Sequence, residues 1–188
     1  WHMSYARRLS ERSNVRSPGN ERVENLFDGT PGTGRNQRKY LILNYELLKN
    51  NNIIPGFIIR YDQQYILRKF KLKTANDAQS RDPTSMEIYG SNDDNPNVYA
   101  INDWTQVSQG DPWNTSLGLP FARNFLTGEY IITNNNTPYT TYKVVFPTNR
   151  GGSSESMLQL NEVQFYGIDS TTTSTTTTST TTTPPPTT

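Results

Sequence analysis

The stretch Leu67-Arg68-Lys69-Phe70-Lys71-Leu72-Lys73 alternates apolar and basic residues with a period of two. Successive side chains of a β-strand point to opposite faces, so Phe70 and Leu72 point one way and the three lysines point the other. The pattern predicts a strand with one face buried in a core and the other face in water.

Short apolar runs separated by Gly, Pro, Asn and Asp continue from Val23 to Gly167, a spacing typical of a β-sandwich. Strands are predicted near Tyr40–Leu43, Phe57–Arg60, Ile66–Thr74, Ser85–Gly90, Thr105–Gly110, Glu129–Thr133, Thr141–Phe146 and Met157–Tyr166. The predicted core comprises the residues on the apolar phase of these strands, namely Phe70, Leu72, Ile88, Val145, Val163 and Phe165. Periodicity alone also allows a short helix within Leu41 to Asn52. The predicted fold class is all-β, an antiparallel jelly-roll β-sandwich over residues 23–167.

Two segments without a core of their own flank this domain. Residues 1–22 hold five arginines among Ser, Asn and Glu, which predicts an extended basic arm that does not fold alone. Residues 168–188 end in a run of only Thr, Ser and Pro, the composition of a mucin-like, O-glycosylated stalk. The expected O-glycosylation sites are Thr171, Thr172, Thr173, Thr175, Thr176, Thr177, Thr178 and Thr180. N-glycosylation sequons occur at Asn114 and Asn135, both in predicted loops.

Composition restricts the partners and the chemistry. The formal net charge is +1, with basic and acidic residues interspersed, so we expect no nucleic-acid partner. No run of about 18 apolar residues exists, so we expect no membrane insertion. The chain has no Cys, and its single His, His2, lies in the arm. Neither a Ser-His nor a Cys-His pair can therefore be assembled in the domain, and we expect a protein that is not an enzyme.

Several motifs, in order along residues 23–167, carry a resemblance to a known superfamily. They include Asn25-Leu26-Phe27-Asp28-Gly29, the segment from Lys71 to Ser85, Glu87-Ile88-Tyr89-Gly90-Ser91-Asn92, Arg123-Asn124 and the closing segment Leu160 to Gly167. In this order the domain resembles the galactose-binding-like jelly-roll superfamily, and within it the discoidin or coagulation-factor C-type domains and carbohydrate-binding modules. That superfamily contains sugar binders, lipid binders, adhesion domains and structural appendages, so function does not follow from the fold.

The resemblance implies two candidate sites. Such domains often hold a structural calcium ion, and the matching positions here are Asp28 and Glu162; alternatively, Asp28 caps a turn and Glu162 pairs with a base. In sugar-binding members the ligand lies in loops at one end of the sandwich, and the matching loop is Asn76–Asp82. Arg81 could donate to vicinal hydroxyls while Asp77 or Asn76 accepts from them, or Arg81 and Asp82 could form an internal brace.

Two functions remain open at this stage. The first is a secreted or cell-surface adhesion or carbohydrate-binding module displayed on the glycosylated stalk, with glycans as its partners. The alternative is a structural subunit of an extracellular fibre, in which the arm and tail pack on further copies of the chain. In that case the arm would lay backbone hydrogen bonds along a sheet edge of the next molecule.

Overall fold

The computed structural model describes residues 8–11, 15–28, 38–107 and 119–170. In these ranges the chain forms nine strands and one short α-helix, α1 (Tyr45–Asn50). The strands are β1 (Arg8–Glu11), β2 (Tyr40–Ile42), β3 (Gly56–Lys73), β4 (Glu87–Ser91), β5 (Thr105–Gln106), β6 (Tyr130–Ile131), β7 (Tyr139–Val145), β8 (Leu158–Leu160) and β9 (Glu162–Asp169). Every strand pair between them is antiparallel, which confirms the predicted all-β class.

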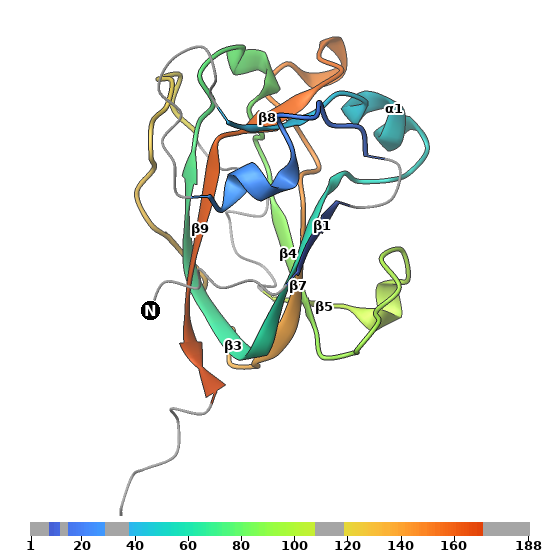
Figure 1. Ribbon diagram of the computed structural model, residues 1–188, viewed down its shortest axis with the longest axis vertical. Helices are drawn as coiled ribbons and strands as arrows, with labels where there is room; N and C mark the ends of the chain where they lie inside the picture. Colours follow the sequence, from blue (N-terminus) through green and yellow to red (C-terminus); the bar gives the residue numbers. More distant parts are fainter. Residues whose placement is uncertain (1–7, 12–14, 29–37, 108–118, 171–188) are drawn as a thin grey trace, which may run out of the picture.

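The long strand β3 bends and contributes its first part to one layer of the sandwich and its second part to the other (Figure 1). Its first part lies between β1 and β7, in the order β1-β3-β7-β4-β5, and its second part pairs with β9 and β6. The pairing with β7 shifts register between Arg60 and Tyr65, where β3 bends. Tyr142 holds this bend, because its hydroxyl donates to the Tyr65 carbonyl and accepts from the Leu67 amide.

Between the layers lies one apolar core that includes Phe57, Phe70, Ile88, Tyr142 and Phe165. A separate two-stranded sheet of β2 and β8 adds buried side chains from Tyr40 to Ile42 and from Leu158 to Leu160. Phe70 and Leu72 are fully buried, as the alternation at residues 67–73 predicted. Lys73, predicted to face water, is only 9% exposed, because it lies between Glu162 and Leu126, which both pair with it. Aromatic rings in the core meet edge to face, a favourable arrangement of their quadrupoles.

Several strand predictions differ from the structure. The two predicted strands Phe57–Arg60 and Ile66–Thr74 are parts of the single strand β3, because the chain bends without leaving the sheet. The predicted strand Met157–Tyr166 is instead divided at Asn161 into β8 and β9. Thr105–Gly110 is shorter, with β5 ending at Gln106, and its last residues lie outside the described ranges. The helix considered within Leu41 to Asn52 is present as α1.

One predicted core residue faces the other way. Val145 is buried, but it lies opposite Gly56 and Glu87, on the outer face of the sheet. Its neighbour Val144 lies opposite Phe57 and Ile88 and belongs to the core. The run Val144-Val145-Phe146 is apolar at every position, so the alternation of apolar and polar residues could not show which of these side chains face the core. Val145 is covered instead by a loop that packs on the outer face.

Part of the predicted arm contacts the domain of its own chain. β1 pairs with residues 57–60 of β3 at the sheet edge. Further on, the Arg16 carbonyl accepts from the Leu43 amide and the Arg16 amide donates to Asn44 Oδ1, both at 2.9 Å. Pairing of the arm with a further copy stays a prediction. Within the described ranges, no helix is long and apolar enough to cross a membrane.

Candidate functional site

Three loops meet at the end of the sandwich where β3 and β7 end and β4 begins (Figure 1). They are residues 74–86, residues 119–127 and residues 146–157. Thr74, directly after β3, fixes the second loop: its hydroxyl donates to the Ala122 carbonyl at 2.7 Å and accepts from the Phe125 amide at 2.9 Å. A single side chain thus positions the loop that carries the exposed aromatic residues of this end.

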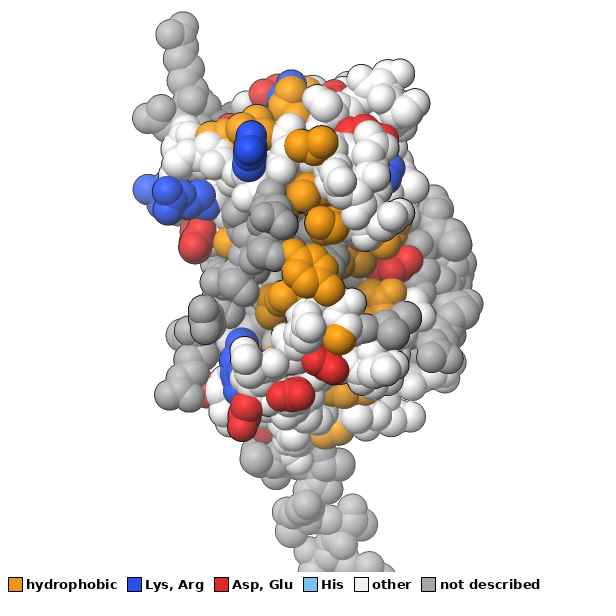
Figure 2. Space-filling view, turned by 90° about the vertical axis from the view of Figure 1, so that its right-hand side faces the viewer, with side chains coloured by type: hydrophobic (Ala, Val, Ile, Leu, Met, Phe, Trp, Pro, Cys, Tyr) orange, Lys and Arg blue, Asp and Glu red, His pale blue; other side chains and the backbone are white. Residues whose placement is uncertain are grey.

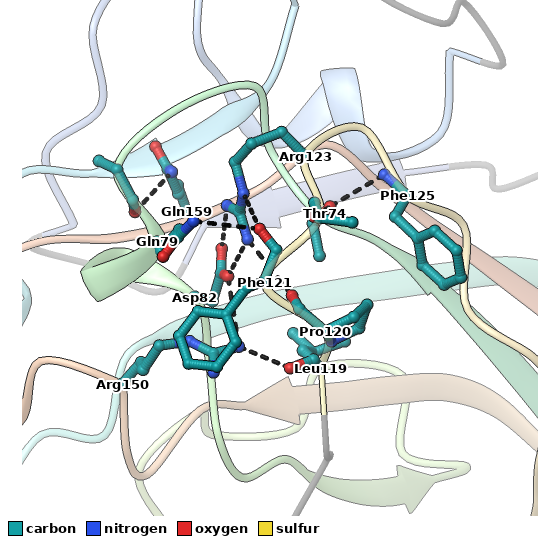
Figure 3. A network of polar contacts seen from close by, with 12 residues as sticks. Thr74, Gln79, Asp82, Leu119, Pro120, Phe121, Arg123, Phe125, Arg150 and Gln159 are labelled. Atoms are coloured by element: carbon teal, nitrogen blue, oxygen red, sulfur yellow. Dashed lines mark hydrogen bonds and ion pairs between the residues drawn. The ribbon is translucent and has the colours of Figure 1, made fainter.

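Asp82 is the anchor of the three loops, and its side chain is completely buried (Figure 3). Its carboxylate accepts two hydrogen bonds from Arg123, at 2.9 and 2.5 Å, and lies 3.5 Å from Arg150 Nη2. Arg123 also donates to the carbonyls of Asp77 and Phe121. Arg–carboxylate pairs of this kind are geometrically specific, so Asp82 and Arg123 hold the loops in fixed relative positions.

Phe121 is the most exposed large hydrophobic residue of the described ranges, with 62% of its surface accessible. Its ring lies over Arg150, with the guanidinium carbon 4.2 Å from the ring centroid. Arg150 is itself held by Asp82 and by the Leu119 carbonyl. The exposed side chain of Gln79 donates to the Phe121 carbonyl at 3.2 Å. The arrangement is an open aromatic platform with its underside fixed and polar groups at its edge.

A second polar group of this end centres on Lys39, whose side chain is 4% exposed. Its ammonium donates to Asp77 Oδ1 at 2.6 Å and to Gln159 Oε1 at 2.9 Å. Gln159 in turn donates to the Asp77 and Ala78 carbonyls. Desolvation raises the pKa of Asp77, but the hydrogen bonds and positive charge around it outweigh that effect and lower the pKa overall. Asp77 therefore presents a half-exposed, ionised carboxylate at neutral pH.

The four predicted ligand residues occupy different environments. Asp82 is an internal brace, and its main partner is Arg123 rather than its sequence neighbour Arg81. Arg81 lies 3.7 Å from Glu155, which also accepts a hydrogen bond from Ser80. Asp77 is at the surface, and Asn76 has a buried Oδ1 without a hydrogen-bond partner. Contact of these residues with a sugar stays a prediction.

Sequence reasoning did not assign Phe121, Arg150, Lys39 or Gln159 to this site, and it named Arg123 only within a motif. The apolar-rich run of residues 119–126, which lies outside the predicted strands, was the available signal for exposed aromatic residues. The partners of Arg123 and Arg150 carried no such signal, because each lies far from Asp82 in the sequence.

The predicted calcium ligands have other neighbours in this structure. Asp28 lies 3.8 Å from Arg38, and Glu162 accepts a hydrogen bond from Gln164 and lies opposite Lys73. The described residues contain no group of three or more His, Cys, Asp or Glu side chains placed to hold a metal ion. Residues 29–37, which follow Asp28 directly, lie outside the described ranges. Calcium at Asp28 and Glu162 therefore stays a prediction.

The predicted glycosylation sites also fall largely outside the described part of the chain, which excludes Asn114 and Thr171 to Thr188. Asn135 is described and is 3% exposed. Its Nδ2, the atom that would carry an N-glycan, donates to the Leu67 carbonyl at 2.9 Å. Attachment of a glycan there would require this buried side chain to become accessible to solvent.

Comparison with known proteins places the fold. No family model matches the chain, and no curated protein sequence matches it. Among solved structures, an F-lectin from striped bass serum is similar with a TM-score of 0.59 at 12% identity, over 86% of this chain and 47% of that one. This chain therefore spans about half the length of the F-lectin.

Two single-domain structures are covered over most of their length. An F5/8 type C domain from Bacteroides fragilis has a TM-score of 0.58 at 13% identity, over 85% of this chain and 89% of that one. The domain CpGH89CBM32-5 from Clostridium perfringens, in complex with GalNAc-β-1,3-galactose, has a TM-score of 0.53 at 18% identity. The match covers 84% of this chain and 94% of that one. The chain thus has the galactose-binding-like jelly-roll fold, as the sequence motifs predicted.

Proposed function

We propose that this chain is a non-catalytic carbohydrate-binding module whose ligand lies on the surface around Phe121. The observation that carries the proposal is the exposed Phe121 ring held on Arg150, whose guanidinium is fixed by the buried carboxylate of Asp82. Exposing a large aromatic ring on a loop has no benefit for folding. Holding that ring rigid is what a binding platform requires.

Sugars suit such a surface because a pyranose ring has an apolar face of C–H groups and a rim of hydroxyls. The apolar face can pack on Phe121, and the rim needs donors and acceptors in fixed positions. Gln79 supplies an amide beside the ring, and Asp77 supplies an ionised carboxylate. Arg123 links both segments, because it donates to the carbonyls of Asp77 and Phe121.

The comparisons support this choice of ligand class. The similar structures include a lectin and carbohydrate-binding modules, one of them in complex with GalNAc-β-1,3-galactose. We therefore propose galactose-type sugars as the first ligands to test. The absence of Cys and the single His, which lies in the arm, support a non-catalytic role.

The experiment is a calorimetric titration of the full chain with GalNAc-β-1,3-galactose. We expect binding to the unchanged chain, and Phe121→Ala to weaken it by at least about tenfold, which corresponds to about 1.4 kcal/mol. The matched control is Leu47→Ala on α1, a residue that is 57% exposed and lies outside the three loops. Equal affinities for both variants would contradict the proposed platform.

We also propose that the module is extracellular and displayed on residues 168–188 as an O-glycosylated stalk. The support is compositional: beyond β9, which ends at Asp169, residues 170–188 are only Ser, Thr and Pro, a composition with no core-forming side chain and many hydroxyls for O-linked sugar. The check is the intact mass of the protein from its natural source. A mass equal to that of the bare polypeptide would end the stalk proposal and leave the sugar site untouched.

A further inference from the structure

A groove of about 310 Å³ lies on the outer face of the sheet, away from the three loops. Its floor is formed by β4 and β7, where Tyr89 lies opposite Lys143 and Glu87 lies opposite Val145. Figure 2 shows the face of the molecule that carries α1 and the loop of residues 92–104, and apolar side chains gather on it. The walls come from these two segments: Asn52 and Ile54 follow α1, and Val98, Tyr99 and Trp104 belong to the loop.

The loop is fastened to the sheet, so the groove is preformed. Arg60 on β3 donates to Asp94 of the loop at 2.9 Å. The Trp104 indole donates to the Asn97 carbonyl at 2.8 Å. Preformed walls lower the entropic cost of binding an extended segment.

The aromatic residues of the groove surround a buried ammonium. Lys143 Nζ lies 4.8 Å from the Tyr89 ring centroid and 4.5 Å from that of Trp104, so one face of each ring is taken. Flat stacking of a sugar on those faces is therefore blocked. Tyr99 is the aromatic lining residue with the largest exposed fraction, 48%. The accessible part of the groove is a slot lined by the edges of aromatic rings and by aliphatic side chains, with polar groups at its margin.

The end of this chain has the chemistry to fill such a slot. Residues 184–186 are three consecutive prolines between threonines, and residues 170–188 contain no charged side chain. Such a sequence favours the polyproline II conformation, whose carbonyls have no internal hydrogen-bond partners, and aromatic-lined grooves bind this conformation. Asn52, at the margin of the groove, can donate to those carbonyls. One Lys and one Glu in the lining make a groove without net charge, which suits a neutral segment.

The tail is also long enough to reach the groove of its own molecule. β9 ends at Asp169, opposite Tyr65, which lies opposite Tyr139 at the start of β7. Lys143 is four residues further along β7, which is about 13 Å at the rise of a strand. The fourteen residues from Ser170 to Thr183 can extend over about 43 Å in polyproline II geometry.

We propose that the groove between α1 and the loop of residues 92–104 binds Pro184–Pro186 of the chain's own tail. This contact is independent of the sugar site, because it shares no residue with the Phe121 platform. Tethering gives the tail an effective concentration on the order of 1 mM, so a contact with a Kd of about 1 mM would be populated in about half of the molecules.

The test uses the full chain, whose lack of Cys allows one label at a chosen position. A nitroxide is attached to the variant Thr188→Cys, and the broadening of backbone amide signals is measured by NMR. We expect the amides of Val98, Tyr99 and Lys143 to lose most of their intensity. Replacing all three prolines by Ser, or Tyr99 by Ser, should restore it, whereas the control Leu47→Ser should not.

Three outcomes would overturn the proposal. The first is an unbroadened groove in the labelled chain. The second is equal broadening when the prolines are replaced. The third is broadening of the same extent when an isotope-labelled chain without nitroxide is mixed with unlabelled chains that carry it, because the occupant would then be the tail of a second copy. Shifts of the groove amides on addition of GalNAc-β-1,3-galactose would identify it instead as a sugar site and would also contradict the proposal.

Discussion

Arg123 and Asp82 form a bidentate ion pair in which the carboxylate is completely buried and the guanidinium also donates to the backbone carbonyls of Asp77 and Phe121. Forty-one residues separate the two partners in the sequence. Asp82 also lies 3.5 Å from Arg150, which packs on the Phe121 ring, and Arg123 donates to the Phe121 carbonyl, so the rigidity of the proposed platform depends on this pair.

The first prediction is that Asp82→Asn destabilises the protein by about 3 kcal/mol, because it leaves the charges of Arg123 and Arg150 without their buried counterion. Urea unfolding measures the change. The control is Asp94→Asn, which removes a fully exposed partner of Arg60 and should leave the unfolding free energy almost unchanged. Equal stability of the two variants would show that Asp82 is not an anchor.

The second prediction concerns pH. The pKa of Asp77 is lower in the folded state than its ordinary value of 3.8, so its ionised form stabilises the fold. That contribution is complete above the ordinary value and is lost as the pH falls through the lower folded pKa. Unfolding free energies measured from about pH 6 to about pH 2 should decline less steeply for Asp77→Asn than for the unchanged chain. Identical slopes would contradict the pairing with Lys39. The effect should be modest because Asp77 is half exposed.

The third prediction tests the close packing of β3 against β7. A Cβ atom on Gly56 would lie 1.9 Å from the Val144 carbonyl oxygen and 2.7 Å from the Val145 Cα. Because both are backbone atoms that cannot move aside, Gly56→Ala should cost at least about 3 kcal/mol. Gly128→Ala is the matched control, since no atom lies within 4 Å of its added Cβ. A thermal melt of each variant distinguishes them.

The fourth prediction retains the calcium site implied by the family resemblance. If calcium binds at Asp28 and Glu162, the melting temperature should rise in calcium and fall in chelator, because the ion binds only the folded state. At a calcium concentration of about 100 times Kd the gain is about 2.7 kcal/mol. Asp28→Asn and Glu162→Gln should each abolish the rise. A melting temperature that chelator leaves unchanged would remove calcium from the description of this protein.

Much of the fold could be predicted from local patterns. The alternation around Phe70 identified a strand with its buried face, because the two-residue period of a strand is a property of the backbone itself. The order of the motifs identified the jelly roll. The phase of Val144 and Val145 could not be predicted, because both are apolar and only the pairing with β3 and β4 decides which one faces the core.

For the candidate site, the sequence named the loop Asn76–Asp82, and the structure places this loop beside Phe121 and Arg123, a neighbourhood that the sequence did not predict. Asp82 had an arginine beside it in the sequence, and the structure pairs it with Arg123 and Arg150 instead. Arg81 turns to Glu155.

The sequence by itself therefore determined the all-β class, the strand around Phe70 and the uncharged Thr/Pro tail, since each follows from neighbours along the chain. Only the tertiary structure decided that Phe121 lies on Arg150 and that Tyr89 and Trp104 meet at Lys143. The physical reason is that these contacts join residues from different loops and strands. Their geometry depends on the path of the whole chain, which local periodicity does not encode.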